Sequence, residues 1–191
     1  WQGQMYITDP SGDAEEDWGD IVAFYWANNQ DNDHLYWMIE RAPATHPAHY
    51  TVYLDANNNG RYNDHVDRLI DVDYNPTHNG SHVTVTVSYA DTHKKISKTS
   101  NNDWGEPDSE GGRKVEFKAS FRDLGLHVGQ TIRMYVKSCV GGDGEEDDKE
   151  SDKEVVDRVP DTGDVQWSPV PILGYPLLAG MGITAGEFMG E

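Results

Sequence analysis

Apolar and polar residues alternate one by one over many short segments of this 191-residue chain. The clearest example is segment 82–89, where Val83, Val85, Val87 and Tyr89 alternate with histidine, threonine and serine. Successive side chains of a β-strand point to opposite faces of a sheet, so this alternation predicts strands with one buried and one wet face. We expect further strands over 4–7, 20–27, 34–41, 50–54, 66–74, 114–119 and 132–137.

Breaks rich in Gly, Asn, Asp and Pro separate these segments, and helical periodicity is nearly absent. The pattern predicts an all-β protein, an antiparallel β-sandwich of the immunoglobulin-like or jelly-roll-like kind. Asn79-Gly80 predicts a hairpin turn, and Phe121 to Gly125 predicts a single helical turn that ends at glycine. We expect one domain over 1–167, followed by a distinct segment over 168–191.

The chain carries 34 acidic and 15 basic residues, a net charge of -19. Self-repulsion of this size keeps a protein soluble but opposes compaction, and bound divalent cations relieve it. No basic patch is evident in the sequence, so nucleic acid and anionic membrane surfaces are not expected as partners. Cys139 is the only cysteine, which excludes intramolecular disulfides and cysteine-based zinc sites.

Oxygen-bearing residues recur at every second position after Leu54, and a glycine follows the third of them. Calcium loops of the EF-hand type take ligands from positions 1, 3, 5, 7 (a backbone carbonyl) and 9, with Gly at position 6. Position 12 is Val66 rather than Glu, so the closing acid has to be Asp64, Asp67 or a residue elsewhere. The loop predicts a Ca²⁺ site, against the alternative of an Asn/Gly-rich turn. The candidate ligands are Asp55, Asn57, Asn59, the Arg61 carbonyl, Asn63, and Asp64 or Asp67.

Two further acidic turns resemble this loop in composition. The first precedes the strand at 20–27, and we expect it to lie beside Asp55 and complete its coordination shell. The second follows the acidic run 141–154, which we interpret as a solvated loop or a further cation site. Their candidate cation ligands are Asp13, Asp17 and Asp20 in the first turn and Asp157, Asp161 and Asp164 in the second.

Beyond Trp167 the chain is apolar, rich in Gly and Pro, and nearly uncharged. Three interpretations stay open: a strand that pairs with a neighbouring subunit, an internally docked strand, or the remnant of a membrane or sorting anchor. An exposed apolar strand promotes aggregation, so a soluble protein has to bury it. The candidate assembly residues are Pro171, Ile172, Leu173, Tyr175, Leu177 and Leu178.

Enzyme signatures are missing from the sequence, which contains neither a Gly-x-Ser-x-Gly elbow nor a Gly-rich phosphate loop. We therefore expect a protein that is not an enzyme. Trp104 lies in a polar loop, where an exposed ring can stack on a sugar. Trp26 and Trp37 lie in predicted strands and are expected in the core.

The order of several segments resembles exported β-sandwiches related to family 9 carbohydrate-binding modules and DOMON domains, over about residues 4–167. The segments are Asp9-Pro-Ser-Gly-Asp13, Asp17-Trp-Gly-Asp20, His34 to Ile39, Tyr50 to Asp55 with its loop, Val115 to Phe117, Asp123 to Leu126, and Pro160 to Asp164. The resemblance implies an immunoglobulin-like sandwich with structural calcium, and functions that range over sugar binding, haem binding and surface architecture. We match no Met and His pair to the haem ligands of DOMON domains.

These observations predict an exported, calcium-binding structural protein that assembles with itself into a filament or surface layer. The chain begins with Trp1 rather than Met, and we expect a mature form from which a signal peptide has been removed, located outside the cell or on its surface. The alternative is a carbohydrate-binding module of a secreted protein, with a glycan as its ligand.

Overall fold

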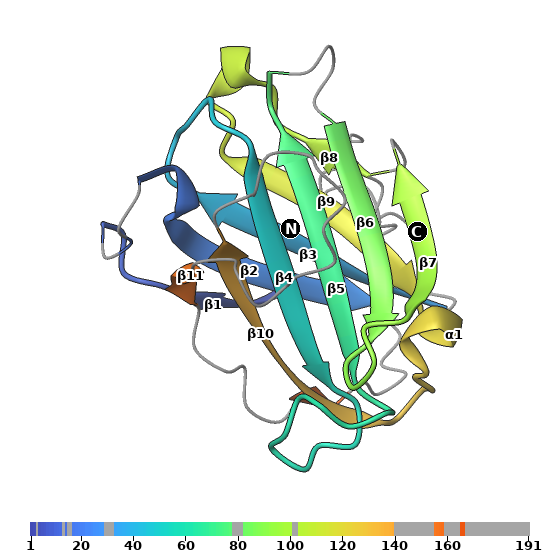
Figure 1. Cartoon of the computed structure of the whole chain (residues 1–191). Helices are drawn as coiled ribbons and strands as arrows, with labels where there is room; N and C mark the ends of the chain where they lie inside the picture. Colours follow the sequence, from blue (N-terminus) through green and yellow to red (C-terminus); the bar gives the residue numbers. More distant parts are fainter. Residues whose placement is uncertain are drawn as a thin grey trace, which may run out of the picture.

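The chain forms two antiparallel sheets that pack face to face (Figure 1). The computed structural model describes residues 1–2, 4–12, 14, 17–28, 33–77, 82–100, 103–139, 155–158 and 165–166, the last two ranges as backbone only. The five-stranded sheet has the order β1 (Met5–Thr8), β2 (Ile21–Asn28), β3 (His34–Arg41), β9 (Lys114–Ser120), β8 (Trp104–Gly105). An all-β antiparallel sandwich is therefore confirmed.

The seven-stranded sheet has a longer meander at its centre. Its order is β11 (Val155–Arg158), β10 (Thr131–Cys139), β4 (Ala48–Asp55), β5 (Arg68–Asn75), β6 (His82–Tyr89), β7 (Lys95–Ser100). The two-residue β12 (Val165–Gln166) pairs with the start of β10. Two 3-10 turns, η1 (Asp17–Gly19) and η2 (Asp108–Glu110), and one four-residue helix, α1 (Phe121–Leu124), complete the described elements. None of the described helices is long and apolar enough to cross a membrane.

The inner faces of both sheets build one hydrophobic core. Trp26 and Trp37, expected inside, are 5% and 0% exposed. The Trp37 ring stacks on Phe117 of the neighbouring strand with centroids 5.3 Å apart, and its indole N–H donates to Met134 Sδ of the facing sheet at 3.2 Å. This contact joins the two sheets at the centre of the sandwich.

Strand positions agree with the alternation to within a few residues, and the differences have physical causes. The strand expected from Val66 begins instead at Arg68, because the Asp67 side chain is used to close the preceding loop. The sequence did not predict β7, since Ile96 is its only apolar residue. The helical turn forms as expected: Ser120 caps it by accepting from Asp123 N–H, and Gly125 ends it at φ 69°. The hairpin turn Asn79-Gly80 lies outside the described residues, although β5 and β6 pair directly on either side of it.

A buried guanidinium holds one end of the sandwich together. Arg41, at the end of β3, is 1% exposed. Its Nε donates to Gly112 O at 2.8 Å, and its two terminal nitrogens donate to three further backbone carbonyls, those of Trp18, Ala44 and His46, each at 2.9 Å. Carbonyl groups of three loops thus accept hydrogen bonds from this one side chain. Its guanidinium also lies over the Tyr74 ring.

Replacing Arg41 by Met should destabilise the fold by roughly 3 kcal/mol or more, because four carbonyls lose their charged donor while side-chain volume is kept. Urea unfolding followed by tryptophan fluorescence measures the change. The matched control is Arg113→Met, whose side chain is 44% exposed and whose Nε lies 3.5 Å from Glu106 Oε2. Equal stability of the two variants would contradict this role of Arg41.

Candidate metal site

The loop between β4 and β5 is built around the carboxylate of Asp55, the last residue of β4. Asp55 is fully buried. Its Oδ1 accepts the Asn59 N–H at 3.2 Å, and its Oδ2 accepts the Gly60 N–H at 2.7 Å. At the first ligand position of the predicted calcium loop, the chain is therefore folded back over the carboxylate.

The two asparagines at the third and fifth positions turn the chain in the same way. Asn57 Oδ1 accepts the Asn59 N–H at 3.2 Å, and Asn59 Oδ1 accepts the Arg61 N–H at 2.8 Å. Gly60 has φ 80°, a left-handed conformation that glycine adopts without strain. Each amide oxygen has a second lone pair that these bonds leave available for a cation.

Asp64 closes this part of the loop. Its Oδ2 accepts from Asn59 Nδ2 at 2.6 Å and from Asn57 Nδ2 at 3.2 Å. These two hydrogen bonds, Asn59 first, lower the pKa of Asp64 below its ordinary value. Asp55, Asn57, Asn59 and Asp64 are thus gathered in one loop of the folded protein.

Asp67, one of the two acids that the sequence offered to close the calcium loop, binds the backbone of the loop instead. It is fully buried, and its two carboxylate oxygens accept the backbone N–H groups of Ala56 at 3.0 Å and Asp64 at 2.8 Å. Burial raises the pKa of Asp67, and the two backbone hydrogen bonds oppose that rise. Asp67 fixes both ends of the loop, which leaves Asp64 as the acid that faces the asparagines. Arg61 and Asn63 are exposed on the same loop.

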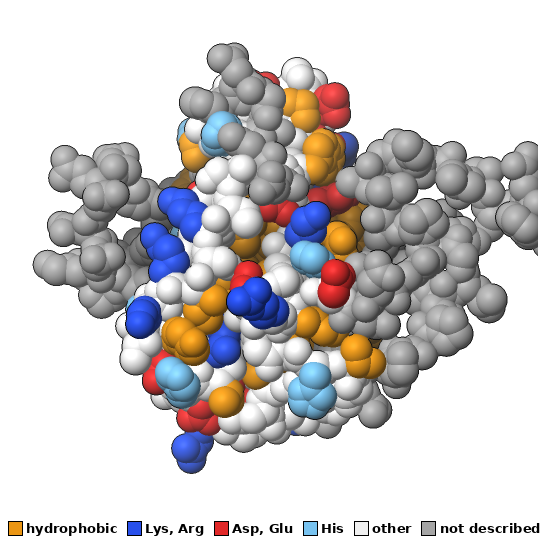
Figure 2. Space-filling model, turned by 90° about the vertical axis from the view of Figure 1, so that its right-hand side faces the viewer, with side chains coloured by type: hydrophobic (Ala, Val, Ile, Leu, Met, Phe, Trp, Pro, Cys, Tyr) orange, Lys and Arg blue, Asp and Glu red, His pale blue; other side chains and the backbone are white. Residues whose placement is uncertain are grey.

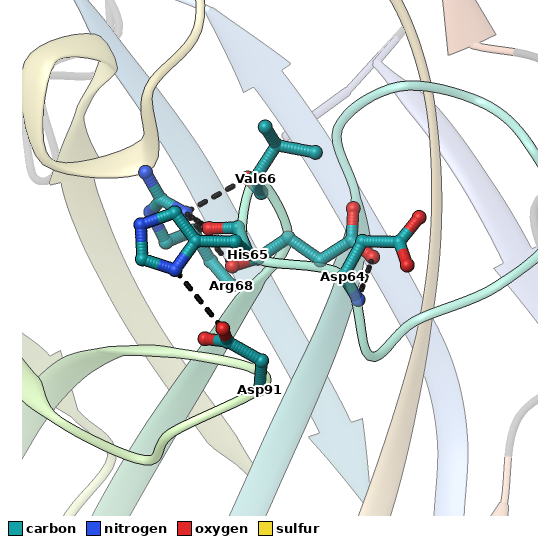
Figure 3. Close-up of polar contacts among 6 residues, drawn as sticks. Asp64, His65, Val66, Arg68 and Asp91 are labelled. Atoms are coloured by element: carbon teal, nitrogen blue, oxygen red, sulfur yellow. Dashed lines mark hydrogen bonds and ion pairs between the residues drawn. The ribbon is translucent and has the colours of Figure 1, made fainter.

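An arginine supports the loop from below (Figure 3). Arg68 Nη1 donates to the carbonyls of His65, Val66 and Asp67 at 3.0, 2.8 and 2.8 Å, and its Nε donates to Asp123 O at 3.0 Å. Val66, which occupies the twelfth position, is 47% exposed and supplies no acid. The figure also shows His65 reaching over to Asp91 on the β6–β7 turn, with Nδ1 and Oδ2 3.0 Å apart.

Two side chains from around β10 hold the other side of the loop. Gln130 Nε2 donates to Ala56 O, and Arg133 Nε donates to Asn58 Oδ1 at 2.7 Å. Asn58 has φ 55°, so this contact fastens the loop at a backbone conformation that few residues adopt. Sequence reasoning missed Gln130, Arg133 and Arg68, because isolated polar residues far away along the chain carry no motif.

The structure does not bring Asp20 to this loop, so the expectation that it completes the shell of Asp55 is wrong. Ile21 pairs with Arg41, whose side chain reaches the loop just before β4 begins. Asp55 lies at the far end of the eight-residue β4, about 23 Å away. Asp20 Oδ2 instead accepts from Ser11 Oγ at 3.2 Å and the Gly12 N–H at 2.8 Å. Asp13 lies outside the described residues, and of Asp17 only the backbone, in η1, is described.

The second acidic turn is also described only in part. The backbone of Asp157 lies in β11 and pairs with Ser138, five residues along β10 from Arg133, the partner of Asp55. Asp157 is therefore not part of the loop. Asp161 and Asp164 lie outside the described residues, as do all the candidate assembly residues beyond 167. Trp104 begins β8 and is 40% exposed.

The donor set suits a hard cation, since carboxylate and amide oxygens are the ligands that Ca²⁺ prefers. Within the described part of the chain no group of three His, Cys, Asp or Glu side chains is placed to hold a metal. A cation in this loop would thus depend on the two asparagines together with Asp55 and Asp64. No protein-family description, curated protein or solved structure matches the chain.

Replacing Asn59 by Ala should raise the pKa of Asp64 toward the ordinary 3.8 in the metal-free protein, because the strongest hydrogen bond to the carboxylate is lost. A lowered pKa means that the ionised carboxylate stabilises the fold above pH ~4, and that this contribution disappears as the pH falls through the folded-state pKa. NMR titration of the Asp64 carboxyl carbon measures the value. Asn63→Ala, an exposed position on the same loop, is the control and should leave it unchanged. A pKa of Asp64 that is identical in all three proteins would contradict the described loop geometry.

Proposed function

We propose that the protein is an exported structural protein without enzymatic activity, a β-sandwich that holds Ca²⁺ in the loop 55–67 and associates with copies of itself. One observation carries the calcium part of this proposal. The buried Asp55 carboxylate organises a loop in which two asparagine amides and the Asp64 carboxylate converge. The arrangement resembles the opening of an EF-hand-type loop, in which Asp64 would take the place of the usual twelfth-position acid.

Charge supports the choice of a divalent cation. The net charge of -19 opposes compaction, and the loop itself contains Asp55, Asp64 and Asp67. A bound Ca²⁺ would neutralise part of this charge within the loop. Exported proteins meet millimolar calcium, so even a weak site is filled there.

Calcium in this loop would stabilise the whole sandwich rather than one turn. The loop joins β4 to β5, and Gln130 and Arg133 connect it to β10. A ligand that binds only the folded state stabilises it by roughly 3–4 kcal/mol at 100 to 1,000 times its dissociation constant. The structural role that we propose for the protein therefore includes dependence on calcium.

Replacing Asp64 by Asn should weaken calcium binding by about tenfold or more, since a charged ligand becomes a neutral one. Among the described residues the Asp64 carboxylate accepts only from the exposed amides of Asn57 and Asn59, and its backbone contacts with Asp67 do not depend on the carboxylate, so the metal-free variant should fold as the parent does. Isothermal titration calorimetry with Ca²⁺ measures the affinity, and thermal melting in chelator measures the metal-free stability. Asp108→Asn, an exposed acid in η2, removes the same charge elsewhere and should bind calcium normally. Parent protein whose melting curve is the same in calcium and in chelator would remove calcium from the proposal.

The self-association part of the proposal rests on the apolar segment 168–191 as a strand that pairs with a neighbouring subunit. All described elements end by Gln166, so removal of residues 168–191 leaves each of them intact. The shortened chain should sediment as a monomer under conditions in which the full chain assembles, as analytical ultracentrifugation will measure. Assembly of the shortened chain to the same extent would exclude the segment as the intersubunit strand.

A specific observation favours the alternative function, glycan binding. One row of residues crosses the outer face of the five-stranded sheet, with exposed aromatic rings at its two ends: Tyr6, Tyr25, Met38, Glu116 and Trp104. Tyr6 is 58% and Trp104 40% exposed, and the Trp1 indole donates to Glu116 Oε1 at 2.8 Å above the middle of the row. Aromatic rings beside carboxylates are a common setting for sugars. Glycan binding that is lost in a Trp104→Ala protein that remains monomeric would favour this function over the first.

A further inference from the structure

Basic residues are concentrated along one edge of this acidic protein, so the expectation that the chain has no basic patch is wrong. Seven of the 15 Lys and Arg residues lie between positions 94 and 122, with only five acids. The rest of the chain holds eight basic residues and 29 acids. The fold gathers five of the seven around β7, the end of β9 and α1, and we call this set the basic edge: Lys94, Lys95, Lys98, Lys118 and Arg122.

Four of the five side chains of the basic edge are available to a partner. Lys94, Lys95, Lys98 and Arg122 are exposed, and within the described residues no hydrogen bond or ion pair engages their charged groups. Lys118 is half-buried, with its Nζ over the Tyr36 ring. Arg41 and Arg68, in contrast, are buried on backbone carbonyls. Figure 2 looks onto this side of the molecule, where Lys and Arg side chains lie among hydrophobic, acidic and histidine side chains.

The basic edge borders a cleft of about 240 Å³ between the two sheets. Ser97 and Thr99 of β7 line one wall, and Lys118 and Ser120 of β9 line the other. Two acids, Asp103 and Asp123, also line the cleft, and Asp103 Oδ1 accepts the Lys118 N–H at the edge of β9 at 3.0 Å. The cleft gives the edge a concave polar surface that an extended chain segment can follow.

The chain contains a segment of complementary charge. Residues 143–154 hold eight acids and two lysines. Cys139 and Val155 pair with each other at the two ends of segment 140–154, so its 15 residues leave from the end of β10 and lead into the neighbouring strand β11. Folded back on itself, such a segment reaches about 25 Å at full extension.

At that reach only the tip of the segment could touch the basic edge of its own molecule. The segment leaves β10, four strand spacings or about 19 Å from β7, and has to return to β11, five spacings or about 24 Å from β7. Lys118 and Arg122 belong to the other side of the cleft, where the facing sheet lies about 10 Å further away. The segment of a second molecule has no such restriction.

We propose that the basic edge is the docking surface for the acidic segment 143–154 of a second copy of this chain. The contact joins different surfaces of the two molecules, so repetition gives an open chain rather than a closed dimer. It is electrostatic and exposed, and therefore weakens as salt shortens the Debye length. The inference rests on the self-association in the proposed function, and it adds the surface that orients the copies before the apolar segment engages.

The test compares two variants of the full chain with equal net charge. In the first, Lys94→Gln, Lys95→Gln and Lys98→Gln neutralise the basic edge. In the second, Gln2→Glu, Thr8→Glu and Thr45→Glu lower the charge equally at exposed positions away from it. Sedimentation in calcium at low salt should show the self-association constant of the first about tenfold weaker than that of the parent, and that of the second nearly unchanged.

Exchanging the charges of the two surfaces tests whether association can be restored. Lys94→Glu, Lys95→Glu and Lys98→Glu in one chain should associate with a chain in which Glu145, Glu146, Asp147 and Asp148 are each replaced by Lys, although each associates poorly alone. The inference is overturned if the glutamine variant assembles as the parent does, or if the two exchanged chains do not associate when mixed. Parent protein that stays monomeric overturns both this inference and the self-association part of the proposed function, while its calcium affinity tests the other part separately.

Discussion

The connection between β4 and β5 depends on two fully buried carboxylates, Asp55 and Asp67, that bind the backbone of their own loop. Each accepts two N–H groups, at distances from 2.7 to 3.2 Å. Burial of an ionised group is costly unless hydrogen bonds compensate it, and here the compensation comes from the turns that the loop has to make. The same bonds that stabilise the charges therefore set the positions of Asn57, Asn59 and Asp64.

Two buried arginines donate hydrogen bonds to backbone carbonyl groups, as the two buried carboxylates accept them from backbone N–H groups. Arg41 binds four carbonyls at the end where β4 begins, and Arg68 binds four near the end where it finishes. Loops bring backbone groups into the protein that no sheet can pair. One planar cation with several donors satisfies a group of them and fixes the loops relative to one another. The candidate calcium loop rests on the second of these arginines.

Much of this fold can be predicted from the alternation of apolar and polar residues, because a strand with one buried and one exposed face has a period of two in its sequence. Strand β6 shows the pattern fully, and its bounds were predicted without error. Strand β7 at the sheet edge has only Ile96 to mark it, and β8 and β12 are two residues long. Such strands exist because a neighbour offers hydrogen-bonding groups, and a single sequence does not display that neighbour.

In the candidate site too, some contacts can be predicted from the sequence and others depend on the packed protein. The spacing of Asp55, Asn57, Asn59 and Gly60 predicts where the chain folds back over a carboxylate, since each of those contacts spans five residues or fewer. The choice between Asp64 and Asp67 as the facing acid depends on which side chain the sandwich buries, and that is a property of the packed protein. Arg133 and Asn58 are 75 residues apart in sequence, so only the pairing of β10 with β4 brings them together.

The central claim is that a divalent cation completes the loop that Asp55 organises. The most direct measurement is hydrogen exchange of the Asn59 and Gly60 amides, followed residue by residue by NMR in chelator and in millimolar Ca²⁺. Both amides donate to Asp55, and a bound cation should slow their exchange by about a hundredfold or more through the stabilisation of the closed loop. Exchange of these two amides at the same rate with and without calcium would contradict the account.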